Sequence, residues 1–182
     1  ISGTCDLAPI DEQEAMLKEL LPDAKTVGIL YCSAEPNSAY QAKKFEEALE
    51  KDGIKYKEYT AADSNEIQSV VTSAVDECDA LYIPTDNTSN TEIINNICLP
   101  AKVPVIAGEQ GICEGCGIAT LSISYYDIGY RAGEMAYDIL VNGKDISTMD
   151  IESAPNVTKM YNKTICDELG ITVPDDYEAI EE

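Results

Sequence analysis

Two short runs of consecutive apolar residues constrain the fold of this chain more than any other feature of its sequence. Thr26–Tyr31 (TVGILY) and Ala80–Pro84 (ALYIP) show no alternation of polar and apolar side chains. A strand with one solvated face alternates, whereas a strand buried on both faces reads as a continuous apolar run. We therefore expect both runs to be central strands of a sheet that is covered on both sides.

Amphipathic segments separate the predicted strands. In the segment 66–76, for example, apolar side chains from Ile67 to Val75 recur at helical spacing. Strands that alternate with helices form right-handed crossovers and a mainly parallel sheet. We therefore predict an α/β fold, a doubly wound three-layer α/β/α sandwich, with Ser38 as the N-cap of its second helix. The predicted helices are 11–21, 38–52, 66–76 and 91–99, and the predicted strands are 26–31, 54–60, 80–84, 103–107 and 118–123.

The last third of the chain has a different pattern. One long helix is predicted over 125–142, with either Ser124 or Asp127 as its capping residue. A short extended piece at 150–153 and a final helix over 157–169 are expected to follow it.

The chain is strongly acidic and has no histidine. Its 182 residues include 34 Asp and Glu against 12 Lys and Arg, which gives a formal net charge of −22. Such a charge repels nucleic acid and anionic membranes, so neither is an expected partner. Without histidine, Ser-His-Asp and Cys-His catalysis are excluded. Because no G-x-G-x-x-G or P-loop follows the first strand either, we expect a protein that is not an enzyme and holds no cofactor.

Apolar runs in the sequence are too short to cross a bilayer, which takes roughly 18–20 residues. The first five residues, ISGTC, have no basic or apolar region of the kind found in signal peptides. We therefore expect no direct insertion into a membrane.

The chain has seven cysteines, an odd number. Cys98 and Cys166 lie beside isoleucines and are expected in the core. Cys113-Glu-Gly-Cys116 is a lone CxxC, which could be half of a zinc site or a redox pair, or a turn that carries two thiols or a local disulfide. Because a second CxxC is missing, we favour the turn and expect no metal site.

Ligands of open parallel sheets bind beyond the carboxyl ends of the strands. The loops predicted there, 32–38, 85–89, 108–110 and 124–127, each contain a carboxylate. Several carboxylates suit an ammonium group, and the start of the helix near Ser38 suits a carboxylate. This combination describes an amino-acid pocket, although the loops of any α/β domain are polar. The candidate residues are Ser33, Glu35, Asn37, Ser38, Asp86, Asn87, Glu109 and Asp127.

The same loops resemble those of a known family. The segments KTVGILYCSAEPNS (25–38), YIPTDNT (82–88), PVIAGE (104–109) and GIATLSISYYDIGYRAGEMA (117–136) are similar to ABC-transporter substrate-binding proteins of the tryptophan/tyrosine-binding type. The opening SGTCDLAP (2–9) resembles the segment in which the family's chain passes between its two lobes.

The resemblance implies a type I periplasmic-binding-protein fold, whose two lobes close on a ligand at a hinge. It implies that this chain is the second, flavodoxin-like lobe without the N-terminal lobe, with a hinge segment at 1–8, a ligand-binding lobe at 9–124, and a crossover helix with terminal elements at 125–182. By the same resemblance, Ser33, Glu35, Asn37 and Ser38 face the cleft, Asp86 and Asn87 hold the α-ammonium group, and Glu109 and Asp127 line the hinge side.

The family delivers a small amino acid to a membrane permease. The resemblance therefore implies tryptophan, tyrosine or phenylalanine as ligand, an ABC permease as partner, and an extracytoplasmic location with a lipid anchor in the full-length form. Two alternatives stay open, a truncated or engineered scaffold without competent binding and the effector-sensing core of a LacI-type regulator. Without the other lobe, helix 125–142 would expose Ile128, Met135, Ile139 and Leu140, which predicts a homodimer or a second chain that supplies the lobe.

Overall fold

The two apolar runs form the centre of a mainly parallel sheet in the computed structural model, which describes residues 1–182 except 63–64, 87–89, 155 and 181–182. The strand order is β3-β2-β4-β5-β6-β8-β9, and all neighbours from β3 to β6 pair in parallel. The α/β prediction is therefore confirmed. The strands are β2 (Thr26–Cys32), β3 (Lys55–Ala61), β4 (Ala80–Ile83), β5 (Val105–Ala107), β6 (Ala119–Ile123), β8 (Val157–Tyr161) and β9 (Glu178–Ala179).

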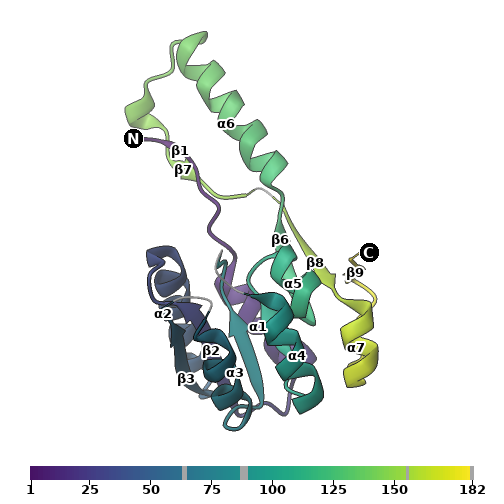
Figure 1. Cartoon of the computed structure of the whole chain (residues 1–182). Coiled ribbons are helices and arrows are strands. Elements are labelled where there is room, and N and C mark those ends of the chain that lie inside the picture. Colours follow the sequence, from purple (N-terminus) through teal and green to yellow (C-terminus); the bar gives the residue numbers. More distant parts are fainter. Residues whose placement is uncertain (63–64, 87–89, 155, 181–182) are drawn as a thin grey trace.

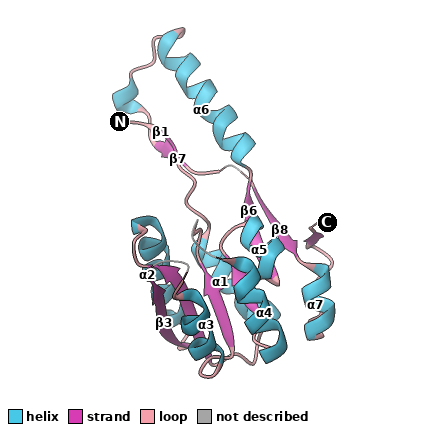
Figure 2. Cartoon of the chain, in the orientation of Figure 1, coloured by secondary structure: helices cyan, strands magenta, loops and turns pink. Residues whose placement is uncertain are grey.

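Helices cover both faces of this sheet (Figures 1 and 2). On one face, α1 (Ile10–Leu20) and α2 (Pro36–Lys51) share an apolar cluster with the strands. On the other, a second cluster contains residues of α3 (Ile67–Val75), α4 (Thr91–Ala101) and α5 (Gln110–Cys116). The strand order and these two layers make a doubly wound sandwich.

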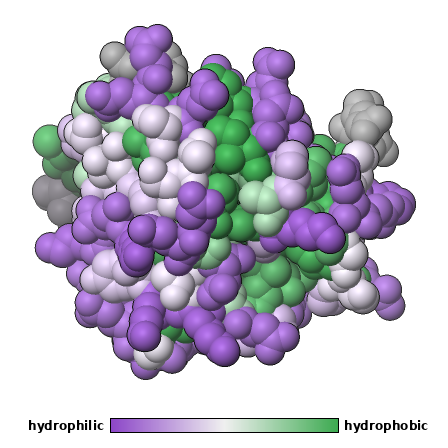
Figure 3. All heavy atoms as spheres, turned by 60° about the horizontal axis from the view of Figure 1, so that its bottom comes forward, coloured by the Kyte–Doolittle hydropathy of each residue, from purple (hydrophilic) through white to green (hydrophobic). Residues whose placement is uncertain are grey.

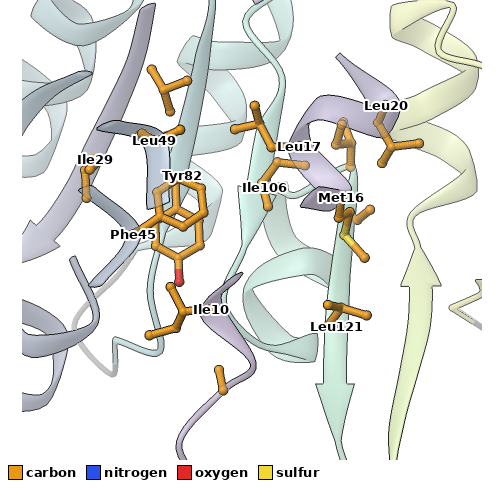
Figure 4. Packing of buried hydrophobic residues seen from close by; sticks show 14 of the residues in the cluster. Ile10, Met16, Leu17, Leu20, Ile29, Phe45, Leu49, Tyr82, Ile106 and Leu121 are labelled. Carbon is orange, nitrogen blue, oxygen red and sulfur yellow. The ribbon is translucent and has the colours of Figure 1, made fainter. Parts of the chain in front are cut away.

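An aromatic stack lies in the middle of the first cluster. The rings of Phe45 and Tyr82 lie 3.7 Å apart and nearly parallel, and both side chains are fully buried. Figure 4 shows this stack beside Ile29, with Leu17 of α1 and Ile106 of β5 packed nearby. Side chains from two helices thus hold the central strands in register.

The predicted helix 157–169 is wrong. Residues 157–161 form β8, which pairs antiparallel with β6, and only Lys163–Leu169 form a helix, α7. Asn162 separates the two elements, because its side-chain oxygen accepts a hydrogen bond from the Ile165 amide and caps α7. Pairing with β8 satisfies the backbone of β6, which would otherwise form the edge of the sheet.

A long helix and two short strands project from the sandwich (Figure 1). This part, which we call the arm, contains β1 (Gly3–Thr4), α6 (Tyr125–Leu140), the short 3-10 helix η1 (Ile146–Thr148) and β7 (Ile151–Glu152), and β1 pairs with β7. Ser124 caps α6, and Arg131 of α6 makes a bidentate ion pair with Glu152 of β7. The residues that follow α6 are therefore divided, with η1 and β7 in the arm and β8, β9 and the last helix in the sandwich.

Much of α6 is exposed. Leu140 is 82% exposed, as predicted, but Met135 is only 3% exposed, so its predicted exposure is wrong. The exposed large hydrophobic side chains of α6 are Tyr125, Tyr126, Tyr130, Tyr137 and Leu140. Among the described residues, no helix combines the length and the apolar character that a membrane span requires.

The underside of the sandwich, where β2, β4 and β5 begin, has a groove of about 370 Å³. Leu20 and Leu21 at the end of α1 line it together with Leu169 and Ile171. Figure 3, which brings this side forward, shows hydrophobic residues exposed between hydrophilic ones. This groove lies at the opposite end of the strands from the predicted ligand loops.

Candidate functional site

The loops that follow β2 and β4 meet at the upper edge of the sheet. Asn37 and Ser38, in the first turn of α2, both donate hydrogen bonds to the Thr85 carbonyl, from Asn37 Nδ2 at 3.1 Å and from Ser38 Oγ at 3.2 Å. The Thr85 amide in turn donates to Gln41 Oε1 at 3.3 Å. Because parallel strands end at the same edge, segments far apart in sequence converge here.

Ser38 does not cap α2, contrary to the prediction. The helix begins at Pro36, its N-cap is Glu35, and no side chain makes a capping hydrogen bond. Proline is common in the first turn of a helix, because the backbone amides of that turn have no intrahelical partners and a missing N–H costs nothing there. Ser38 is buried instead, with its hydroxyl on Thr85 and 3.4 Å from Glu35 Oε2.

Asp86 is a buried residue that connects the loop after β4 to the end of β2. Its side chain is 6% exposed, and Oδ2 accepts a hydrogen bond from the Cys32 amide at 2.6 Å. Such a charge-assisted bond fixes the end of β2 against the loop after β4. Its neighbour Asn87 lies outside the described residues.

Ser33 and Glu35 lie on the loop between β2 and α2. Ser33 is exposed, and its amide donates to the Ala61 carbonyl at the end of β3 at 3.0 Å. Glu35 is half-buried, and its amide donates to the Cys32 carbonyl at 3.1 Å. These two backbone hydrogen bonds thus fix the conformation of the loop between β2 and α2, which ends beside Asn37.

Glu109 caps a helix that the sequence did not predict. Its carboxylate accepts hydrogen bonds from the amides of Gly111, at 2.9 Å, and Ile112, at 2.6 Å. The CxxC segment is therefore not a turn, since Gln110–Cys116 form α5. A Cβ at Gly115 would come within 2.2 Å of the Thr91 hydroxyl, so glycine is required where α5 packs on α4.

The CxxC cysteines are core residues of α5. Both thiols are buried and free, and each donates to a backbone carbonyl, Cys113 to Gly117 and Cys116 to Ile112. Burial is the main cause that raises the pKa of each thiol well above its ordinary value. Across the part of the chain that the structure describes, no three Cys, Asp or Glu side chains are grouped as metal ligands.

Asp127 lies at the base of the arm, in the first turn of α6. Its amide donates to Ser124 Oγ, and its carboxylate accepts from Asn156 Nδ2 at 3.5 Å. Glu109 and Tyr125 line a separate hollow of about 240 Å³ between α5 and the start of α6. The candidate residues thus form one group around Thr85 and another toward the arm.

Sequence reasoning did not select three residues of this region as site residues, namely Gln13, Gln41 and Thr85. Gln13 is fully buried, and its Nε2 donates to the carbonyl of Gly108, the residue after β5. A signal was present, because Gln13 stands at helical spacing between Ile10 and Leu17 on the apolar face of α1.

The chemistry of the first group suits a ligand with a positive charge. It contains carboxylates and uncharged donors, and the predicted site residues include no lysine or arginine. The first turn of α2 adds backbone amides at the positive end of a helix of 16 residues. A zwitterion would find groups of both kinds here.

Comparison with known proteins gives consistent results. The sequence pattern of the family described as "ABC transporter substrate binding protein" matches residues 1–180. A tyrosine-binding protein of Clostridioides difficile (strain R20291) is 31% identical over 165 residues, which are 90% of this chain and 48% of that protein.

Two solved structures resemble the chain closely. A ligand-free, open substrate-binding protein with adhesive properties from Clostridium difficile has a TM-score of 0.84 and 35% identity, over 99% of this chain and 62% of its own. An ABC domain from Streptococcus pneumonia in complex with L-Trp has a TM-score of 0.85 and 30% identity, over 98% of this chain and 64% of its own. The chain thus spans about half of the curated relative and under two thirds of these structures.

Proposed function

Because the chain belongs to the family of ABC transporter substrate-binding proteins, we propose that it binds an aromatic amino acid at the carboxyl ends of β2, β4 and β5. The observation that carries this proposal is the convergence of Asn37 and Ser38 on Thr85, next to the carboxylate of Asp86. The names of two relatives, one tyrosine-binding and one in complex with L-Trp, support an aromatic side chain on the ligand.

Each end of the ligand has a proposed partner. We assign the α-ammonium group to Asp86 and Asn87, with Glu35 of the loop after β2 as a further carboxylate on this side. The ligand's carboxylate lies at the start of α2, where Asn37 and backbone amides of the first turn can donate to it. Ser33 completes this wall, with the buried Ser38 behind it, and Glu109 and Asp127 line the hinge side.

The whole protein is proposed to close over this site with a second lobe. The relatives of known structure are longer than this chain, which covers 62% and 64% of them. The arm, with residues 1–8 and α6, would carry the chain to that lobe, and the exposed tyrosines of α6 would pack against it. Enclosure between two lobes removes more of a ligand's surface from water than one open face can.

The proposed role is transport, without catalysis. The closed protein would present its amino acid to an ABC permease outside the cytoplasm, with a lipid anchor on the full-length form. An amino acid that binds the closed conformation more tightly than the open one shifts the population toward the closed conformation. The permease can then distinguish the loaded protein from the empty one.

Calorimetry with L-tryptophan, L-tyrosine and L-phenylalanine tests the proposal. Asp86→Asn is the informative variant, because asparagine keeps an oxygen for the Cys32 amide while it removes the charge. We expect at least a tenfold weaker affinity, since a hydrogen bond to a charged group contributes about 1.5–3 kcal/mol.

Asp79→Asn is a matched control at the other end of β4. The Asp79 carboxylate also accepts backbone hydrogen bonds, from the amides of Lys25 and Thr26, but it lies on the underside. This variant should bind like the wild type. Equal affinities of both variants, or no heat with any of the three amino acids, would refute the proposed site.

A further inference from the structure

A fully buried glutamine lies directly behind the proposed site. Gln13 of α1 uses both ends of its side chain, since Oε1 accepts a hydrogen bond from the Tyr82 hydroxyl at 2.7 Å and Nε2 donates to the Gly108 carbonyl at 3.1 Å. On the same helix, Ile10 and Leu17 belong to the apolar cluster on this face of the sheet. A polar group in such surroundings is stable only with partners, so these two bonds define one orientation of the side chain.

Tyr82 is itself held in place. Its ring is fully buried and stacks on Phe45 of α2 at a centroid distance of 3.7 Å. Figure 4 shows the hydroxyl directed toward Ile10 at the start of α1. Gln13 therefore receives its hydrogen bond from a rigid group that is anchored by both a helix and a strand.

The other end of Gln13 leads to the site. The Gly108 carbonyl also lies 3.5 Å from the hydroxyl of Thr85, and Thr85 accepts the hydrogen bonds of Asn37 and Ser38. The loops after β4 and β5 are in direct contact here, because a Cβ on Gly108 would lie 2.6 Å from the Thr85 nitrogen. A displacement of Gly108 therefore displaces Thr85 as well.

We infer that Gln13 is a positioning residue, which fixes the Gly108 and Thr85 loops and through them Asn37 and the first turn of α2, where the proposed ligand's carboxylate would bind. This inference rests on the proposed function as far as the ligand is concerned. Its effect on the loops is a property of the ligand-free chain and can be measured separately.

The double variant Gln13→Leu/Tyr82→Phe tests the inference. Removing both partners leaves neither a buried amide nor a buried hydroxyl without a hydrogen bond, so the fold should be kept. The control is Leu17→Met, which changes packing on the same face of α1 with no polar contact. Tyr82→Phe alone keeps the bond to Gly108, so its effect should be smaller, and it serves as a second variant if the double variant does not fold.

Two readouts separate positioning from stability. In ¹⁵N spectra of the ligand-free chain, the Thr85 amide and the Glu109 amide, which shares its peptide group with the Gly108 carbonyl, should shift in the double variant and stay in place in Leu17→Met. In calorimetry of the whole protein with L-tryptophan or L-tyrosine, the double variant should bind about tenfold more weakly. A tenfold change in affinity corresponds to the loss of about one hydrogen bond between protein and ligand. The urea midpoints of the double variant and of Leu17→Met should be similar.

Unchanged Thr85 and Glu109 signals would overturn the inference, and so would shifted signals with wild-type affinity. If the wild-type protein bound neither amino acid, the proposed function would fail. The position of the loops would then be decided by the two amide signals alone, with a shift in the double variant supporting the role of Gln13 and no shift refuting it.

Discussion

Gly108→Ala should destabilise the chain at the point where the loops of the site meet. A Cβ at this position would lie 2.6 Å from both the Pro84 carbonyl carbon and the Thr85 nitrogen. Ordinary contacts of a Cβ start at 3.4 Å, so the two loops would have to separate by 3.4 − 2.6 = 0.8 Å. The atoms in the way are backbone atoms, which cannot rotate aside as a side chain does.

The cost follows from what holds those atoms. The Gly108 amide donates to the Ile83 carbonyl at 2.7 Å, and Ile83 pairs with Ala107 in the sheet. Overpacking costs about 1–3 kcal/mol, and a weakened backbone hydrogen bond adds about 1 kcal/mol. We therefore expect the free energy of unfolding to fall by about 2–4 kcal/mol, measured by urea denaturation followed by circular dichroism.

Gly133→Ala is the matched control. A Cβ there meets nothing within 4 Å, and the residue lies inside α6. Alanine in a helix interior is favoured over glycine by about 1 kcal/mol, so this variant should be slightly more stable than the wild type. A Gly108→Ala chain that unfolds at the wild-type urea concentration would show that the two loops are not in the contact described.

Two further predictions concern titration and thiol reactivity. Burial first, and then the nearby Glu58, raise the pKa of Glu46 to about 7, so the folded state holds a proton between about pH 4.5 and 7 that the unfolded chain releases. The free energy of unfolding should therefore fall as pH rises through that window. Glu46→Gln should raise it at pH 8 by about 1 kcal/mol, with solvent screening allowed for, and leave it unchanged at pH 4. Urea titrations at both pH values check this, and an equal effect at both would contradict it. Cys5 is the half-buried thiol among the cysteines, whose other members are buried, so Ellman's reagent should label about one thiol rapidly in the native chain. Cys5→Ser should abolish that fast phase, and a fast phase that survives would place another thiol at the surface.

The sequence was sufficient to predict the order of elements from α1 to β5. Continuous apolar runs identified β2 and β4 as central strands, and the helical stripe of 67–75 identified α3. These patterns reflect burial, which is a strong and repeated signal along the chain. The convergence of loops at one edge followed from the parallel sheet.

Local features without a long period were harder to predict. β8 is only five residues long and runs into α7 after Asn162, so a helical pattern over 157–169 concealed the strand. In α5 two glycines lower the helix propensity, and the close packing against Thr91 that requires Gly115 is a tertiary contact.

The hydrogen-bond partners of individual side chains could not be predicted from the sequence. The residue types of Asp86 and Glu109 suggested a ligand site, but their hydrogen bonds to the amides of Cys32 and Ile112 depend on how distant or local backbone is placed. The same holds for Gln13, whose spacing indicates burial and whose partners only the fold defines.

The most direct test is a crystal structure of the whole protein with L-tryptophan or L-tyrosine bound. The account predicts the ligand's ammonium group beside Asp86 and its carboxylate at the first turn of α2, near Asn37. An amino acid seated away from both residues, in the underside groove for instance, would contradict it.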